Sequence, residues 1–286
     1  ASVGPGMTNV TRHGDGADAV PTRDGMAMLG YGTWKLADRE TCIDAITTAL
    51  ETGYRHLDTA RMYDNETYVG EAIANADVDR EEVFLATKIW PDDLAPEDAI
   101  DAAYDSLENL DTDYLDLLYI HWPAKAYDPS GTLEAFDRLV EEGVPERIGV
   151  SNFTPELLAD ACDRTTAPIF ANQFECHPLL PRPRWREACA DHDVHPVAYA
   201  PIARQEVFEE PAIIEIAEAH DASPAQVSLA WLRQRDVTAI PKAASADHIR
   251  ENWASLSLDL EEAELAAIDG IETRSRKVDP SFAPWN

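Results

Sequence analysis

Short apolar runs alternate with longer amphipathic segments along most of the chain. The longer segments, such as Asp38–Thr52 with Gly53 as its stop and Pro96–Leu110, place apolar residues at helical spacing and predict helices. The short runs predict eight strands. These are Leu29–Thr33, Tyr54–Asp58, Val83–Lys88, Tyr114–His121, Arg147–Asn152, Ile169–Glu175, Pro196–Pro201 and Thr238–Lys242.

Strands that are apolar almost throughout, each followed by a helix, are typical of a parallel sheet covered by helices. At 286 residues the pattern fits one closed (β/α)8 TIM barrel, which we assign to residues 21–286. A turn at Asp24-Gly25 predicts a short hairpin before it. Residues 1–20 lack periodicity, and we expect a flexible N-terminal segment. We interpret Ala1–Gly6 as an artificial extension before a native start at Met7.

Polar residues close seven of the predicted strands. In a barrel of this kind the active site lies at the carboxyl ends of the strands, so these side chains are expected to meet. They are Asp58, Lys88, His121, Ser151 with Asn152, Gln173, Tyr199 and Lys242. Tyr63 follows Asp58 on a polar loop and joins the same candidate site.

The segment Gly53–Gly70 resembles the first signature of the aldo-keto reductase family. Asp58, Tyr63, Lys88 and His121 match the catalytic tetrad of that family, and the resemblance extends from about Pro21 to the C-terminus. It implies an NAD(P)H-dependent carbonyl reductase. Within the family, the chain resembles the microbial diketogluconate-reductase branch.

Hydride reduction of a carbonyl builds negative charge on oxygen, which must be stabilised and then protonated. We assign Tyr63 as the proton donor and expect the Lys88 ammonium to lower its pKa from about 10. Asp58 would compensate the buried cation. A neutral His121 would donate a hydrogen bond to the substrate oxygen.

The resemblance also implies a nicotinamide site. Its expected residues are Tyr199 for ring stacking, Ser151, Asn152 and Gln173 for the carboxamide, and Glu251 and Asn252 for the adenine side. A Gly-x-Gly-x-x-Gly sequence is absent after the first strand, which argues against a Rossmann site.

The last motif departs from the family pattern. The family commonly has a Ser directly after the lysine of Ile240-Pro241-Lys242 and an Arg five residues further on, and both grip the 2′-phosphate of NADPH. Here these positions are Ala243 and His248, while Lys242 remains. We therefore expect use of NADH as well as NADPH.

Three tryptophans, Trp34, Trp90 and Trp122, match positions that line the family's substrate pocket. The segment Ile202–Glu210 and the tail after Arg274 are short. Short loops predict an open pocket for small aldehydes, ketones or sugars.

The net charge is −31, and the acidic residues are dispersed along the chain rather than gathered in a tail. Such a surface repels itself at low salt, so we interpret it as a halophilic adaptation. It argues against nucleic acid or an anionic membrane as a partner.

Scattered cysteines and the lack of a long apolar run favour a cytoplasmic enzyme, which we expect to be a monomer.

Two alternatives remain open at this point. One is a member of the same fold that binds nucleotide without turnover. The other is a metal-dependent barrel isomerase or hydrolase, which would need carboxylate and histidine ligands converging on one ion. Activity that survives a chelator would exclude the second alternative.

Overall fold

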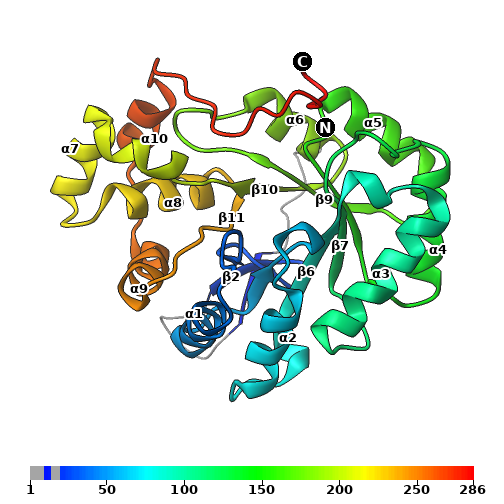
Figure 1. Ribbon diagram of the computed structural model, residues 1–286. Coiled ribbons are helices and arrows are strands. Elements are labelled where there is room, and N and C mark those ends of the chain that lie inside the picture. Colours follow the sequence, from blue (N-terminus) through cyan, green and yellow to red (C-terminus); the bar gives the residue numbers. More distant parts are fainter. Residues whose placement is uncertain (1–9, 14–19) are drawn as a thin grey trace.

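The main sheet is parallel throughout (Figure 1). The computed structural model describes residues 10–13 and 20–286. The eight strands neighbour one another in chain order, from β4 at one end to β11 at the other. They are β4 (Tyr31–Gly32), β5 (His56–Asp58), β6 (Phe84–Ile89), β7 (Leu117–Ile120), β8 (Ile148–Ser151), β9 (Ile169–Glu175), β10 (His195–Tyr199) and β11 (Thr238–Ala239).

The two ends of this sheet meet and close the barrel. Leu29 forms a parallel bridge with Ala239, and the amide of Gly30 donates to the carbonyl of Ala239 at 2.8 Å. A Cβ at Gly32 would lie 2.8 Å from the carbonyl oxygen of Ile240, so the close approach at this seam requires glycine. The predicted (β/α)8 architecture is confirmed.

Helices form the outer layer around the strands (Figure 1). They are α1 (Arg39–Thr52), α2 (Glu66–Asn75), α3 (Pro96–Leu110), α4 (Gly131–Glu141), α5 (Pro155–Arg164), α6 (Pro183–Asp191), α7 (Pro211–Ala219), α8 (Pro224–Gln234), α9 (Ala246–Ala254) and α10 (Glu262–Asp269). Short 3₁₀ turns are η1 (Arg61–Tyr63), η2 (Arg80–Glu82), η3 (Pro91–Asp93), η4 (Ala203–Glu209) and η5 (Ser255–Ser257). Side-chain caps start several helices, such as Asp38 on α1 and Thr154 on α5.

A small antiparallel sheet precedes the barrel. It comprises β1 (Val10–His13), β2 (Val20–Arg23) and β3 (Met26–Ala27), so the predicted turn at Asp24-Gly25 is confirmed. β1 pairs with β2 in antiparallel register, so a strand lies within the segment 1–20 that we expected to be flexible. The remaining residues of that segment, 1–9 and 14–19, lie outside the described part of the chain.

The hairpin plugs the amino end of the barrel. Met26 is fully buried and packs with barrel-interior side chains that include Phe84 and Val197. Asp24 lies 3.0 Å from Nε2 of His195, the first residue of β10. This end of the barrel is thereby filled, and the opposite end is left for the site.

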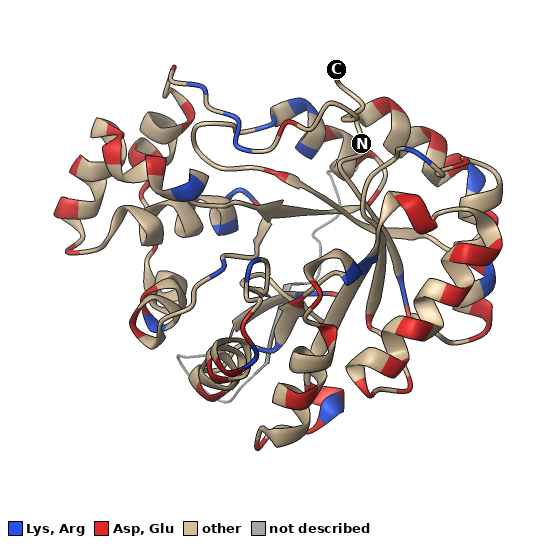
Figure 2. Ribbon diagram, in the orientation of Figure 1, with Lys and Arg blue, Asp and Glu red and all other residues tan. Residues whose placement is uncertain are grey.

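Acidic side chains lie mainly on the outer helices (Figure 2). Of the acidic residues that the structure describes, only Asp58, Glu66 and Glu175 are buried. In the same part of the chain, none of the helices has the length and apolarity needed to cross a membrane.

Candidate active site

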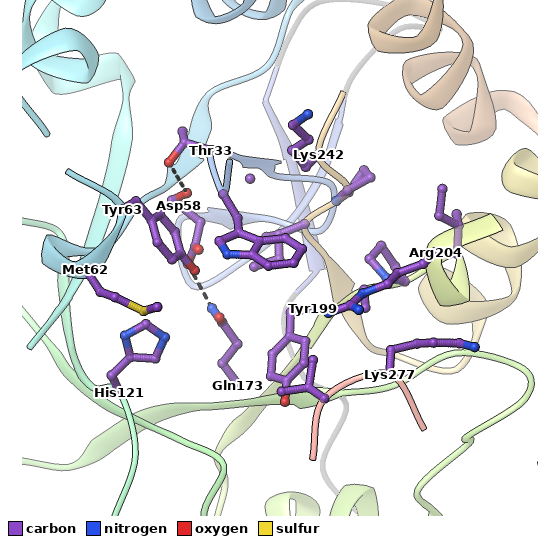
Figure 3. Close-up of a pocket in the computed structure, with 18 of the residues that line it drawn as sticks. Thr33, Asp58, Met62, Tyr63, His121, Gln173, Tyr199, Arg204, Lys242 and Lys277 are labelled. Atoms are coloured by element: carbon purple, nitrogen blue, oxygen red, sulfur yellow. Dashed lines mark hydrogen bonds between the residues drawn. The ribbon is translucent and has the colours of Figure 1, made fainter. Parts of the chain in front are cut away.

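A cavity of about 1070 Å³ opens at the carboxyl ends of the strands (Figure 3). It is lined by most of the strand-end residues that the sequence indicated. These are Asp58, Tyr63, His121, Asn152, Gln173, Tyr199 and Lys242. The barrel therefore brings together side chains at or just after the ends of β5, β7, β8, β9, β10 and β11, as expected for active sites in this fold.

A buried ion pair lies at the base of the cavity. Lys88 on β6 is fully buried, and its ammonium donates to a carboxylate oxygen of Asp58 and, at 2.7 Å, to the carbonyl of Thr59. The other Asp58 oxygen accepts from Nε2 of Gln173 at 2.8 Å. The predicted pairing of Asp58 with Lys88 is confirmed. Two of the three ammonium donors are used in these bonds.

The Tyr63 ring packs against this pair, with its centroid 5.3 Å from the Lys88 ammonium. Burial, followed by the nearby Asp58 and Tyr199, raises the pKa of Tyr63 well above its usual value. The expectation that Lys88 lowers this pKa is wrong for the free site, because Asp58 balances the ammonium and desolvation dominates. The phenol consequently keeps its proton across the physiological pH range, as a proton donor must.

His121 follows β7 and is buried beside the phenol. Its ring lies edge-on to Tyr63 at 6.0 Å and to Trp90 at 5.1 Å, between ring centroids. Burial first, and then the charge of Lys88, lower the pKa of His121 well below its usual value. Its Nδ1 is buried without a hydrogen-bond partner among the described residues. A neutral imidazole carries one N–H donor, and His121 lines the cavity, so a donor on the nitrogen that faces the cavity could hold a substrate oxygen.

A hydrogen-bonded chain connects the neighbouring strand ends. The Tyr199 hydroxyl donates to Oδ1 of Asn152 at 2.7 Å, and Nδ2 of Asn152 donates to Oγ of Ser151 at 3.1 Å. Ser151 in turn donates to the carbonyl of Gln173 at 2.9 Å. Ser151 itself does not line the cavity. Asn152 adopts a left-handed conformation with φ of 64°, a strain that is common at ligand sites.

One end of the cavity carries unpaired positive charge. Lys242 lines it, and the Lys35 ammonium and the Arg204 guanidinium lie 4.5 and 5.2 Å from the Trp34 ring centroid. Within the described residues, none of Lys35, Arg204 and Lys242 has a carboxylate oxygen within 4.0 Å. Burial and the charge of Lys35 lower the pKa of Lys242.

The N-terminal part of α9 borders this cationic end. His248 lines the cavity, whereas Glu251 and Asn252 do not. Sequence reasoning missed Arg204, which lies on η4, and Lys277, which lies in the C-terminal tail. The segments around Arg204 and Lys277 have no periodic pattern. The only signal in the sequence was that each is a basic residue in a strongly acidic chain.

The other end of the cavity is aromatic. The ring of Phe282 lies edge-on to Trp90 at 6.1 Å and to Trp122 at 5.5 Å. Phe282 belongs to the tail that we expected to leave the pocket open. The tail instead lines the cavity with Lys277, Val278, Asp279, Pro280 and Phe282, because its backbone is held against β9.

A parallel barrel with this cluster of lysine, aspartate, tyrosine and histidine defines a reductase of the barrel class. The profile of the Aldo/keto reductase family matches residues 28–273, and the chain belongs to this family. Members of the family are NAD(P)H-dependent oxidoreductases, so the protein is an NAD(P)H-dependent carbonyl reductase.

Similar proteins cover almost the whole chain. An aldo-keto reductase of Mycolicibacterium smegmatis is 39% identical over 87% of this chain and 90% of its own. Methylglyoxal reductase DkgB of Escherichia coli O157:H7 is 36% identical over 90% of this chain and 98% of its own. The crystal structure of a putative 2,5-diketo-D-gluconic acid reductase B superposes with a TM-score of 0.87 at 31% identity, covering 96% of each chain.

We predict that stability falls in acid partly because of His121. The unfolded chain binds a proton at this residue near pH 6.5, whereas the lowered pKa keeps the folded imidazole neutral, so protons favour unfolding below that pH. Urea unfolding of the wild type should lose about 1 to 2 kcal/mol more between pH 7 and pH 5 than unfolding of His121→Gln. His192→Gln, at an exposed histidine, is the control. Equal losses in wild type and His121→Gln would mean that folded His121 is protonated.

Proposed function

We propose that Tyr63 protonates the substrate oxygen, that His121 holds this oxygen in place, and that Lys88 stabilises the phenolate that remains. The observation that carries this proposal is that a protonated phenol, a charge-balanced ammonium and a neutral imidazole lie together at the base of the cavity. Bound NAD(P)H supplies the hydride for the carbonyl carbon. Asp58 would balance the Lys88 ammonium and help to keep the Tyr63 phenol protonated.

The proton transfer depends on the negative charge that develops on the substrate oxygen during reduction. In the free site the phenol is a weak acid. As negative charge develops on the substrate oxygen, that oxygen becomes a stronger base and draws the proton from Tyr63. The phenolate that remains faces the Lys88 ammonium, whose positive charge stabilises it. A hydrogen bond from His121 fixes the oxygen next to the phenol.

The cavity fits a dinucleotide that lies along it. The unpaired cations Lys35, Arg204 and Lys242 suit the phosphates, since guanidinium and ammonium groups are the usual partners of phosphate. The aromatic face of Tyr199 and the amide of Asn152 suit the nicotinamide end. Ser151, Glu251 and Asn252 do not line the cavity. They would support the residues that do.

Both cofactor forms are expected to bind. A 2′-phosphate is best held by the bidentate fork of an arginine, and an imidazole at position 248 cannot replace that fork. Ala243 removes a hydroxyl donor as well. The remaining Lys242 attracts the phosphate only as a point charge. This supports dual use of NADH and NADPH, with a preference for NADPH that is small or reversed.

Small reactive carbonyls are the substrate class that we infer. The relatives include a methylglyoxal reductase and a putative diketogluconic acid reductase, and our assignment to the microbial diketogluconate-reductase-like branch rests on that second likeness. Family membership argues against the two alternatives that the sequence left open, and turnover measurements would distinguish them. A non-catalytic nucleotide-binding protein would bind NADPH without turnover, and a metal-dependent isomerase would lose activity with chelator. No group of three or more potential metal ligands is found in the described ranges.

We propose a halophilic, cytoplasmic and monomeric enzyme without nucleic acid or membrane partners, and the acidic surface supports the halophilic assignment and the absence of anionic partners. The net charge is −31, and nearly all described acidic side chains are at least partly exposed. Molar salt shortens the Debye length to about 3 Å, which removes the repulsion between these charges.

The first prediction concerns the proton donor. Tyr63→Phe should bind NADPH normally but lose about 10²- to 10⁴-fold in kcat for methylglyoxal, because a general acid contributes about this much. Lys88→Met should be similarly impaired. Tyr104→Phe removes a phenol at an exposed site and serves as the control. Turnover by Tyr63→Phe near the wild-type rate would rule out the proposed role.

The second prediction concerns cofactor choice. His248→Arg restores a guanidinium fork next to Lys242, so it should lower the KM for NADPH about tenfold while leaving the KM for NADH nearly unchanged. Initial rates with both cofactors would measure this. A wild-type preference for NADPH of a hundredfold or more would contradict the proposed dual use.

The third prediction concerns salt. Thermal unfolding in 0.1 M and 2 M KCl should show a higher Tm at the higher concentration, because screening removes self-repulsion of the acidic surface. Potassium chloride rather than sulfate is chosen, since sulfate strengthens burial in any protein. Full stability in dilute buffer would argue against the halophilic assignment.

A further inference from the structure

The C-terminal tail is fastened over the active site by one buried carboxylate. Glu175 is the last residue of β9, and its side chain is fully buried. One of its oxygens accepts from the amide of Lys277 at 2.6 Å, and the other accepts from the amide of Val278 at 2.9 Å. Nε2 of His177 lies 2.9 Å from the first oxygen.

This clamp requires a carboxylate. Adjacent amides of an irregular segment present two donors to two acceptor atoms, and only a carboxylate offers two equivalent acceptors. Hydrogen bonds to an ionised acceptor are also about twice as strong as neutral ones. A buried carboxylate is tolerated only when it is fully hydrogen-bonded. Arg182 steadies the same residue, because its Nε donates to the Glu175 carbonyl at 3.3 Å.

The clamped residues reach both ends of the cavity. The side chain of Lys277 forms an ion pair with Glu206 on η4, the segment that also carries Arg204. Four residues after Val278, Phe282 packs edge-on against Trp90 and Trp122. In Figure 1 the red tail runs from α10 toward α6, and Lys277 faces the cavity near Tyr199 and Arg204 in Figure 3.

We propose that Glu175 is a positioning residue that determines the substrate class. By holding the tail it places Phe282 opposite Trp90 and Trp122, which closes an aromatic box next to His121. Among the small reactive carbonyls proposed above, such a box favours one with an aromatic or flat apolar substituent over one with only a methyl group or hydroxyl groups. This inference rests on the proposed reduction at Tyr63 and His121.

Two α-ketoaldehydes that share the reacting group test the proposal. Phenylglyoxal carries a ring where methylglyoxal carries a methyl group. In the wild type, kcat/KM should be at least tenfold higher for phenylglyoxal. Glu175→Gln places an amide NH₂ against one of the two backbone donors, so the preference should fall to less than threefold, mainly through a raised KM for phenylglyoxal. Phe282→Ala should lose the preference in the same way.

A second measurement reports on the tail itself. Limited trypsin digestion with mass spectrometry should cut Glu175→Gln after Arg276 and Lys277 at least five times faster than wild type, since these bonds adjoin the clamp. Glu187→Gln, the same exchange at an exposed position of α6, should match wild type in both measurements. If Glu175→Gln does not fold, Glu175→Asp, whose carboxylate is withdrawn by one methylene, should show the same losses.

The outcomes separate this proposal from the proposed function. Methylglyoxal turnover that depends on Tyr63, with a phenylglyoxal preference and trypsin resistance unaffected by Glu175→Gln, would overturn the role of Glu175 alone. A wild type that prefers methylglyoxal would overturn the aromatic box. Absence of turnover with both aldehydes would instead contradict the proposed function.

Discussion

The need to neutralise one buried ammonium organises the active site. Lys88 is fully buried, and desolvation lowers its pKa, while Asp58 acts in the opposite direction. Asp58 is held in turn by Gln173, so strands β5, β6 and β9 are connected through one carboxylate. A buried pair of this kind adds little net stability, because desolvation offsets the attraction. Its presence is better explained by the chemistry of the neighbouring phenol.

The strand-end pattern allowed most of the site to be predicted from sequence. Parallel strands in a barrel end on one face, so polar residues that close apolar runs must meet there. The bounds of α3 and β9 were predicted to the residue, since their patterns are uninterrupted. The strands at the seam were predicted too long. β4 and β11 contain only two residues each, because the barrel closes there through a single bridge and a few amides.

Other parts of the site could not be predicted, because they depend on distant contacts and on burial. Glu175 and the amide of Lys277 are 102 positions apart, and the tail has no periodic pattern that would indicate where it lies. The pKa of Tyr63 was predicted in the wrong direction for a related reason. Charge near a residue can be inferred from a motif, but the desolvation of its side chain cannot.

Charge is separated between the surface and the site, and salt affects the two differently. Exposed acidic groups interact through water and are screened by salt. The Asp58–Lys88 pair is buried and is screened far less. Arg204 and Lys242 lie between these limits, because they line a cavity whose apolar walls concentrate their field. The Lys35 ammonium lies over the ring of Trp34, another lining residue. In the proposed mechanism, proton transfer depends on interactions that salt hardly reaches, whereas capture of an anionic cofactor depends on interactions that salt weakens. An enzyme adapted to high salt would need more than one cation at the cofactor end, and the three unpaired ones meet that requirement.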